Sequence, residues 1–402
     1  MSAPRKSMSG KPALDQALAA HQSGDVRTAA RLYRAILEHQ PRNANALHLL
    51  GLLLHQTDDH SGAERLIRRA LAEKPDSALF LGNLGRVLKA KGDLLGALGL
   101  YGQALARNPD DAGAHNNMGN IYLSLRRYEE ALASFTRACV LAPDTAAMHY
   151  NRGNALSRLG RDDEALQAFY KATALDDGNV SADHMLAALT GARRDSAPEA
   201  YVEDLFDSYA DSFDVELQEG LGYRVPSLLR EALLRHVEPG RRFRHAVDLG
   251  CGTGLSGLVI RDLAERLTGI DLSARMLANA RKRNCYDELH KQNILEFLKR
   301  RGRYDLVLAA DVLIYVGALE ATFAALDAHL APSAHFVFSV EADPGDGFTL
   351  LKTGRFAHSR PYIQGLADRH GWRLCEAMQA SLRRHFDRQI EGTVYVLRHG
   401  AG

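Results

Sequence analysis

The stretch best suited to bind a small molecule runs from Ala246 to Gly257, where an acidic side chain precedes a series of glycines. It reads Ala-Val-Asp-Leu-Gly-Cys-Gly-Thr-Gly-Leu-Ser-Gly. The apolar run at its start predicts the end of a buried parallel strand, and Leu255 to Leu267 predicts a helix. Glycines allow positive φ and a close approach of a ligand to the backbone, and a helix N-terminus directs free N–H groups toward it. The spacing therefore predicts a ligand-binding loop, with glycines at Gly250, Gly252 and Gly254.

The glycines alone do not identify the ligand. Gly252-x-Gly254-x-x-Gly257 also matches the dinucleotide fingerprint, which is weak evidence by itself. Two acidic residues favour another ligand. Asp248 can reach a positively charged ligand group, and Asp271 ends a second short strand, where its carboxylate can accept hydrogen bonds from ribose hydroxyls. The remaining alternative is a tight strand–helix turn beside an incidental acid.

These residues together resemble the class I S-adenosylmethionine-dependent methyltransferases. The resemblance implies a Rossmann-like α/β domain that uses S-adenosyl-L-methionine. Asp271 would bind the ribose, Leu272 and Met276 would form an apolar wall beside the adenine, and Asn293 replaces the aspartate that usually faces the adenine amino group. The carbonyl of Asn293 can still accept that hydrogen bond. The cofactor-binding residues implied are Asp248, Gly250, Cys251, Gly252, Gly254, Asp271, Leu272, Met276, Asn293, Ile294, Ala310, Asp311 and Tyr209.

Two of these assignments have simple structural alternatives. Tyr209 would touch the cofactor from the helix ahead of the glycine loop, but Phe206, Tyr209 and Phe213 recur at helical spacing and can instead pack on the core. Asp311 would lie beside the methionine moiety, but it can instead cap the helix that follows.

The elements that position these residues alternate between strands and helices, which predicts a doubly wound parallel sheet. The last two strands look like the antiparallel pair that ends the methyltransferase sheet and does not occur in a dehydrogenase. The expected strands are His245 to Leu249, Leu267 to Ile270, Glu288 to Lys291, Tyr304 to Ala310, His335 to Val340, Trp372 to Met378 and Gly392 to Leu397.

Methyl transfer needs alignment and exclusion of water, and it needs a base only if the acceptor carries a proton. The region after the fifth strand should supply acceptor-binding groups, since it collects Glu341, Asp343, Arg355, His358, Arg360 and Tyr362. We assign the catalytic roles to His358, Tyr362 and Glu341, with His358 as a candidate base. The alternative for His358 is a capping or solvated histidine.

The first half of the chain is a repeat array with a period of 34 residues. Prolines recur at Pro41, Pro75, Pro109 and Pro143, and glycines at Gly51, Gly85, Gly119 and Gly153. Alanines keep the same step from Ala29 to Ala165, each followed four residues later by a bulky side chain such as Tyr33. The pattern resembles five tetratricopeptide repeats, each a helix–turn–helix unit whose second helix ends before a proline. We expect the bulky residue to plug into the next repeat.

One column of the array is rich in amides. Asn83, Asn117 and Asn151 are 34 residues apart, and Asn120 and Asn154 follow one helical turn later. The column resembles the asparagine-lined repeats of O-GlcNAc transferase, which implies that these amides line the concave face and pair with the backbone of an extended peptide. The alternative is that they bridge neighbouring helices.

Composition limits the remaining possibilities. The hydrophobic fraction of 46% and charged fraction of 25% are ordinary globular values, and a net charge of +1 gives no field for wrapping nucleic acid. The four cysteines are scattered without a Cys-x-x-Cys pair, so we expect neither a metal site nor a disulfide framework. No apolar run reaches membrane-spanning length. We therefore expect a soluble cytoplasmic protein.

The sequence as a whole predicts an all-α superhelical repeat array over residues 10–179, a linker over 180–198, and an α/β methyltransferase domain over 199–402. This order resembles bacterial-type repeat-containing methyltransferases of the UbiE and BioC kind. It implies an active methyltransferase whose array recruits a protein partner or substrate, with a small-molecule or protein methyl acceptor. The alternative is an interaction scaffold whose Rossmann domain binds S-adenosylmethionine without turnover. A dehydrogenase is a more distant possibility.

Overall fold

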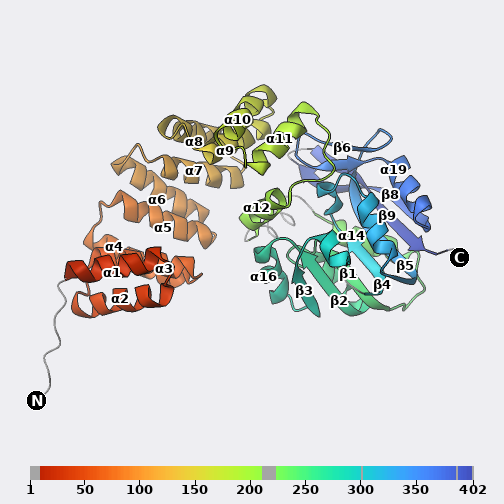
Figure 1. Cartoon of the computed structure of the whole chain (residues 1–402), viewed down its shortest axis with the longest axis horizontal. Coiled ribbons are helices and arrows are strands. Elements are labelled where there is room, and N and C mark those ends of the chain that lie inside the picture. Colours follow the sequence, from red (N-terminus) through yellow and green to blue (C-terminus); the bar gives the residue numbers. More distant parts are fainter. Residues whose placement is uncertain (1–9, 211–222, 300–301, 386–387, 401–402) are drawn as a thin grey trace, which may run out of the picture. The chain divides into compact units, whose positions relative to one another are not determined.

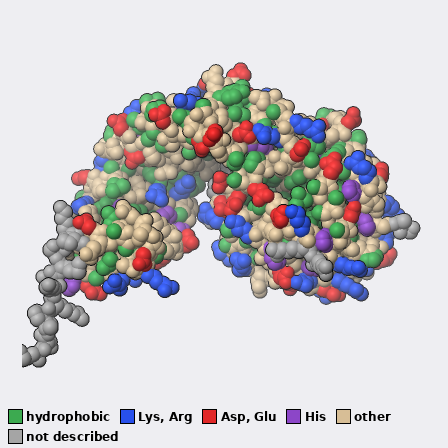
Figure 2. Space-filling model, in the orientation of Figure 1, with side chains coloured by type: hydrophobic (Ala, Val, Ile, Leu, Met, Phe, Trp, Pro, Cys, Tyr) green, Lys and Arg blue, Asp and Glu red, His purple; other side chains and the backbone are tan. Residues whose placement is uncertain are grey.

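The computed structural model describes residues 10–210, 223–299, 302–385 and 388–400, and within these ranges it describes all side chains except those of residues 10–12, 208, 209, 384, 385 and 388. The chain forms two compact units, Met1–Asp176 and Asp177–Gly402. Figure 1 shows helices throughout the first unit and a sheet covered by helices in the second. Acidic and basic side chains are interspersed over the visible face of each unit (Figure 2), in agreement with the small net charge.

The first unit consists of helix pairs, as the period of 34 residues predicts. The pairs are α1 (Gly10–Gln22) with α2 (Val26–His39), α3 (Ala44–Gln56) with α4 (His60–Glu73), α5 (Ala78–Ala90) with α6 (Leu94–Arg107), α7 (Ala112–Ser124) with α8 (Tyr128–Leu141), and α9 (Ala146–Arg158) with α10 (Asp162–Leu175). Aspartate side chains cap α2, α4 and α6, where Asp25, Asp59 and Asp93 each accept a hydrogen bond from a backbone N–H of the first turn. Helices α2, α4, α6 and α8 each end two residues before the repeated proline, so the prediction for the end of the second helix is confirmed.

The repeated glycines and bulky residues meet within one repeat, and the bulky residues also pack toward the next repeat, as expected. Ile67 in α4, for example, shares an apolar cluster with Leu84 in α5. A Cβ at Gly119 in α7 would lie 2.6 Å from Cε1 of Phe135 in α8, its partner in the same pair. Gly153 and Phe169 repeat this arrangement in α9 and α10. The glycine therefore lets the two helices of a pair approach closely.

The second unit is built on one nine-stranded sheet with the order β3-β2-β1-β4-β5-β7-β6, in which β9 pairs with β5 and with β8. Its strands are β1 (Phe243–Leu249), β2 (Ala264–Asp271), β3 (Glu288–Lys291), β4 (Tyr304–Ala309), β5 (Leu330–Ala342), β6 (Phe348–Leu350), β7 (Phe356–His358), β8 (Trp372–His385) and β9 (Arg388–His399). Strands β1 to β5 are parallel. β9 runs antiparallel to β5 and β8, which confirms the antiparallel closing pair. The short strands β6 and β7 were not expected from the sequence.

Helices cover both faces of this sheet. They are α11 (Val180–Thr190), α12 (Glu199–Tyr209), α14 (Val225–Leu234), α15 (Leu255–Ile260), α16 (Ala274–Lys282), α17 (Ile294–Leu298), α18 (Glu320–Asp327) and α19 (Arg360–Arg369), with short 3-10 turns η2 (Arg261–Leu263) and η3 (Leu313–Tyr315). Alternate strand residues face opposite layers: Val247 packs in a core with α18 and α19, and Ala246 in a core with α14. None of the helices within the described residues combines the length and apolar composition needed to span a bilayer.

The structure differs from the sequence analysis at two boundaries. The helix expected to continue to Leu267 ends earlier, because β2 begins at Ala264. Residues 180–198, expected as a linker, belong to the second unit. Nε2 of His184 in α11 donates to the carbonyl oxygen of Gly354 at 2.9 Å, and Ser196 forms a bridge with Val316. These partners lie more than a hundred residues away, so local composition could not reveal them.

Candidate functional site

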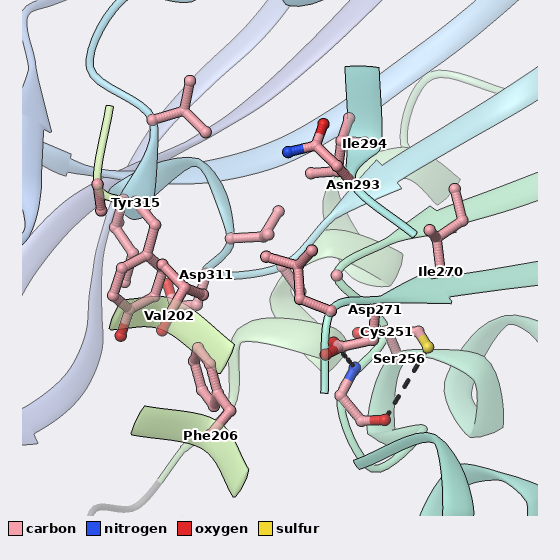
Figure 3. Close-up of a pocket in the computed structure, with 18 of the residues that line it drawn as sticks. Val202, Phe206, Cys251, Ser256, Ile270, Asp271, Asn293, Ile294, Asp311 and Tyr315 are labelled. Atoms are coloured by element: carbon pink, nitrogen blue, oxygen red, sulfur yellow. Dashed lines mark hydrogen bonds between the residues drawn. The ribbon is translucent and has the colours of Figure 1, made fainter. Parts of the chain in front are cut away.

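A cavity of about 450 Å³ lies in the second unit, at the carboxyl ends of β1, β2 and β4. Figure 3 shows side chains from α12, the glycine loop, the end of β2 and the end of β4 around one space. The volume is within the range of roughly 300–1,000 Å³ that is usual for small-molecule sites. The cavity brings together many of the predicted cofactor-binding residues, namely Gly250, Cys251, Gly252, Asp271, Leu272, Asn293, Ile294, Ala310 and Asp311.

The loop after β1 needs its glycines. Gly250, Gly252 and Gly254 have φ values of 68°, 53° and 93°, in the left-handed region that favours glycine. A Cβ at Gly250 would also lie 2.3 Å from Cγ2 of Val312. Gly254 is the N-cap of α15 and is not among the cavity-lining residues, so its role is to turn the chain into the helix.

Asp271 joins the end of β2 to this loop. Its Oδ2 accepts a hydrogen bond from the backbone N–H of Gly252 at 2.9 Å, and its Oδ1 accepts from the N–H of Ser273 at 2.8 Å (Figure 3 shows the former). Burial raises the pKa of Asp271 to about 6, and these two backbone N–H groups act in the opposite direction. Asp271 is thus a fixed carboxylate at the cavity wall, with lone pairs left for a ligand hydroxyl.

Asp248 lies outside the cavity, and the expectation that its carboxylate reaches a ligand group does not fit the structure. The residue is fully buried, and its Oδ2 accepts a hydrogen bond from the hydroxyl of Tyr286 at 2.6 Å. The same hydroxyl accepts a hydrogen bond from the backbone N–H of Gly257 in α15 at 3.1 Å. Burial raises the pKa of Asp248 to about 7. The hydroxyl of Tyr286 therefore links Asp248 to the first turn of α15 by hydrogen bonds.

Two further predicted contacts are not seen at the cavity. Met276 is fully buried in α16 and is not a lining residue, because its side chain faces the protein core. Tyr209 is the last residue of α12, and its side chain lies outside the described residues. Val202 and Phe206, which also lie in α12, line the cavity instead.

Asn293 lines the cavity with its amide partly occupied. Its Oδ1 accepts from the backbone N–H of Leu295 at 2.7 Å and so caps α17, and its Nδ2 donates to Oε1 of Glu199 at 2.8 Å. A carbonyl oxygen has two lone pairs, so one acceptor position remains for a ligand amino group. Leu272 and Ile294 supply apolar surface beside it.

Asp311 is held rigidly at the end of β4. Its φ is 56°, which is unusual for a residue other than glycine. Its N–H donates to Oγ of Ser339 at 2.9 Å, Oγ donates back to Oδ1 at 3.0 Å, and Nη1 of Arg383 donates to Oδ2 at 2.6 Å. The alternative of a helix cap is not what the structure shows, because η3 has Val312 at its N-cap and no side-chain cap.

The three proposed catalytic residues do not line the cavity. His358 in β7 is 1% exposed, and its Nε2 lies 2.9 Å and 3.0 Å from the carbonyl oxygens of Val316 and Gly317. Burial lowers the pKa of His358 to about 4, so the imidazole is neutral near pH 7. Its Nε2–H is used as a donor to the backbone, so the structure makes His358 a buried structural residue.

Tyr362 and Glu341 also have other partners. The hydroxyl of Tyr362 accepts from the N–H of Leu319 and donates to Oε2 of Glu320, each at 2.8 Å, and burial raises its pKa. Glu341 is buried and accepts a hydrogen bond from Nη2 of Arg383. Glu341 thus contacts the site through two arginines that line it, Arg383 and, at 3.9 Å, Arg355.

Several lining residues were missed or left without a role by the sequence analysis. Arg383, Tyr223 and Tyr315 line the cavity from distant segments, and only Arg355 had been noted among the candidates after β5. No short spacing connects these residues, because they meet only when β4, β5, β7 and β8 assemble. Among the described residues, no group of three or more His, Cys, Asp or Glu side chains could hold a metal ion.

The amide column of the first unit divides into two groups. Nδ2 of Asn83 lies 2.9 Å from Nε2 of His48, and Nδ2 of Asn151 donates to Oδ1 of Asn116 at 2.9 Å, so these two amides bridge neighbouring repeats. For Asn83 and Asn151, the alternative that the amides bridge neighbouring helices therefore holds. The half-buried amides Asn117, Asn120 and Asn154 have no such bridge among the described contacts.

Comparison with known protein families gives two matches. Residues 247–336 match the model of a methyltransferase domain, and residues 14–78, 83–145 and 117–180 match that of a tetratricopeptide repeat. The chain therefore contains a methyltransferase domain and a tetratricopeptide array, as the sequence predicts.

Relatives and solved structures match parts of the chain. The trans-aconitate 2-methyltransferase of Paracidovorax citrulli is 42% identical over 91 residues, which are 22% of this chain and 35% of the relative. The malonyl-[acyl-carrier protein] O-methyltransferase of Enterobacter lignolyticus is 31% identical over 112 residues, 28% of this chain and 44% of the relative. The chain thus spans less than half the length of these two relatives.

A MamA structure from Desulfovibrio magneticus is 20% identical with a TM-score of 0.39, over 42% of this chain and 96% of that one. YrrB, described as a TPR protein with an unusual peptide-binding site, is 22% identical with a TM-score of 0.38, over 44% and 91%.

Proposed function

We propose that the second unit is an S-adenosylmethionine-dependent methyltransferase and that the repeat array binds a protein partner or substrate. The observation that carries the first part is the hydrogen bond from the N–H of Gly252 to Asp271, which joins the glycine loop and the β2 carboxylate at one cavity wall. This pairing of a glycine loop with an acid on the next strand suits a ligand with a ribose.

The described residues fit that cofactor. Asp271 offers free lone pairs for ribose hydroxyls, Leu272 and Ile294 offer apolar surface for a purine, and Oδ1 of Asn293 retains one acceptor position for its amino group. S-adenosylmethionine, when bound, supplies a methyl group activated by a sulfonium. The antiparallel pair of β8 and β9 is the feature that we expected of a methyltransferase and not of a dehydrogenase.

The chain's own contribution is positioning and exclusion of water. Positive-φ glycines keep the loop backbone free of Cβ atoms, so a ligand can approach the backbone at Gly250 and Gly252 closely. Phe206, Val202 and Tyr315 supply apolar surface around the same space. A dry cavity favours displacement at an activated methyl group because water does not compete with the acceptor.

The test is calorimetry of the full chain with S-adenosylmethionine, with NAD as the control ligand. The Asp271→Ala variant should bind roughly 10- to 100-fold more weakly, since it loses hydrogen bonds to a charged group. Asp368→Ala, at an exposed position in α19, is the matched control and should bind like the wild type. Absence of binding to folded wild-type protein, or preference for NAD, would contradict the proposal and favour the scaffold alternative.

For the array, the amides Asn117, Asn120 and Asn154 support binding of an extended peptide, because they lack the bridges made by Asn83 and Asn151. Backbone pairing predicts binding with little sequence preference. Replacement of the three amides by alanine should weaken binding of a random-sequence peptide pool, while Gln103→Ala on the exposed side of α6 should not. Equal binding by both variants would contradict this role.

The cysteines bear on the compartment in which this activity takes place. Cys139, Cys251, Cys285 and Cys375 are all free thiols. Unpaired thiols support a reducing, cytoplasmic setting, because oxidising compartments favour disulfides.

A further inference from the structure

Two arginines stand together at the cavity wall. Arg383, from β8, is 5% exposed and donates from Nη1 to Asp311 and from Nη2 to Glu341. Its Nε is buried and has no hydrogen-bond partner among the described residues. Two carboxylates therefore fix this guanidinium in place and balance its charge.

Arg355 is paired much more loosely. It precedes β7, and its nearest ion-pair contact joins Nη1 to Oε1 of Glu341 at 3.9 Å. Its Nε lies 3.4 Å from the hydroxyl of Tyr315, at the long limit for a hydrogen bond. Because Glu341 is already engaged by Arg383, Arg355 presents a guanidinium fork to the cavity without a close carboxylate partner.

The described part of the cavity wall offers few groups that could serve as a general base. No histidine lines it, and each carboxylate there already accepts a hydrogen bond from the chain: Glu199 from Asn293, Asp271 from Gly252, Glu296 from Lys299 and Asp311 from Arg383. The nearest histidine candidate from the sequence, His358, is buried and donates to the backbone. An acceptor that must lose a proton would find no histidine in the described part of the wall, and the lone pairs that Asp271 retains are assigned to the ribose.

We propose that the methyl acceptor is a carboxylate, held by the guanidinium of Arg355, while Arg383 and Glu341 position that arginine. The inference rests on the proposed function. A planar guanidinium binds a carboxylate through two parallel N–H···O bonds, which the loosely paired fork of Arg355 can offer. Such an acceptor is already deprotonated near neutral pH, so it needs no base.

The transfer is balanced without another reactant. A lone pair of one carboxylate oxygen forms the new C–O bond, the C–S bond to the activated methyl group breaks, and its electron pair stays on sulfur. The products are a methyl ester and the neutral thioether, and no proton is released. The chain's part is to hold the carboxylate oxygen in line with the methyl group.

The first measurement is binding of defined probes to the full chain saturated with S-adenosylhomocysteine. The acid probes are malonate, glutarate and tricarballylate, and the neutral matches are malonamide and glutaramide. We expect the acids to bind and the amides not to bind. Arg355→Gln should weaken acid binding roughly 10- to 100-fold and Arg355→Lys should restore part of it. Arg369→Gln, at an exposed position of α19, is the matched control.

The second measurement identifies the bond that is formed. The enzyme is incubated with methyl-labelled S-adenosylmethionine and either the acid probes or a cell extract, and the product is treated with alkali. Methyl esters release labelled methanol, whereas methyl groups on nitrogen or carbon are retained. Equal binding of acids and amides, wild-type binding by Arg355→Gln, or alkali-stable methyl groups would each overturn the inference.

Failure of this inference can be told apart from failure of the proposed function. If the wild type does not bind S-adenosylmethionine, the proposed function fails and the carboxylate acceptor fails with it. If it binds S-adenosylmethionine in an Asp271-dependent way but not the acid probes, only the acceptor class is wrong. Arg355→Gln should bind S-adenosylmethionine like the wild type, because Asp271 and the glycine loop are unchanged in it.

Discussion

The hydroxyl of Tyr286 and the carboxylate of Asp248 lie 2.6 Å apart inside the second unit, where Asp248 is fully buried. Oδ1 of Asp248 has no hydrogen-bond partner among the described residues. An ionised carboxylate with one good donor is costly in such a place, which is why burial raises the pKa of Asp248 to about 7. The acid that the sequence suggests for ligand binding is therefore a buried group that titrates near neutral pH.

Asp248→Asn should stabilise the second unit at pH 8. The folded pKa of about 7 lies above the unfolded value near 3.8, so the wild type loses stability as pH rises from 4 to 7. At pH 8 the asparagine avoids this loss, and the gain should be on the order of 1–3 kcal/mol. Urea denaturation followed by the fluorescence of Trp372 measures it, since this is the chain's one tryptophan and it is buried in this unit.

At pH 5 the folded wild-type carboxyl is still protonated and only part of the loss has occurred, so the gain from asparagine should be clearly smaller than at pH 8. Glu265→Gln serves as the control, because Glu265 is an exposed acid on β2. A gain of equal size at pH 5 and pH 8 would show that ionisation of Asp248 is not the cause.

Cofactor affinity should depend on the ionisation of Asp271. Burial raises its pKa to about 6, and a protonated carboxyl loses acceptor capacity for ribose hydroxyls. Affinity for S-adenosylmethionine should therefore fall about tenfold for each pH unit below 6. Calorimetry between pH 5 and pH 8 would show the fall.

Asp271→Asn provides the matched control, because an amide does not titrate. Its affinity should be lower than that of the wild type at pH 7 and nearly constant with pH. A wild-type affinity that does not change between pH 7 and pH 5 would rule out the role assigned to the Asp271 carboxylate.

In the repeat array, Gly119→Ala and Gly99→Ala should have opposite effects on stability. A Cβ at Gly119 would lie 2.6 Å from Phe135, whereas one at Gly99, exposed in α6, meets nothing within 4 Å. The first change should destabilise by roughly 1–3 kcal/mol through overpacking. The second should stabilise by up to about 1 kcal/mol through helix propensity. Far-UV circular dichroism during urea denaturation compares them, and equal effects would contradict the packing argument.

Much of the fold could be predicted because its signals are local. The period of 34 residues reports one packing contact repeated along the chain, and Gly119 with Phe135 shows what that contact is. Short apolar runs marked β1, β2, β4 and β5. Glycines marked the loop, because the backbone conformation there requires them. Strands β6 and β7 were missed because three residues are too few to show a pattern.

The parts of the site formed by the glycine loop and the strand ends were predicted. The parts that depend on contacts between distant segments of the chain were missed. Gly252 and Asp271 are found by spacing, since consecutive parallel strands end at one edge of the sheet. Burial of Asp248 and the contacts of Tyr362 could not be seen, because Tyr286 and Leu319 lie about forty residues away. Arg383 was missed because no sequence motif marks it. It lies in β8, and its partners Asp311 and Glu341 come from other segments of the sheet.

His358→Ala should lower the stability of the second unit without changing cofactor binding. The buried imidazole donates to the carbonyl oxygens of Val316 and Gly317, and its loss leaves both unpaired and opens a cavity, at a cost of roughly 1–4 kcal/mol. Its folded pKa of about 4 lies below the unfolded value of 6.5, so the wild type also loses this contribution as pH falls from 6.5 to 4. Trp372 fluorescence during urea denaturation at pH 7 and pH 5 measures both effects.

The variant should lose more stability at pH 7 than at pH 5, because at pH 5 the wild type has already lost part of what the imidazole contributes. His329→Ala, a half-buried histidine outside the cavity, is the control and should show neither effect. Calorimetry should give the same S-adenosylmethionine affinity for His358→Ala as for the wild type within about twofold, because His358 does not touch the cavity. If instead stability were unchanged and methyl transfer lost its dependence on pH, His358 would be the base that its position in the sequence first suggested.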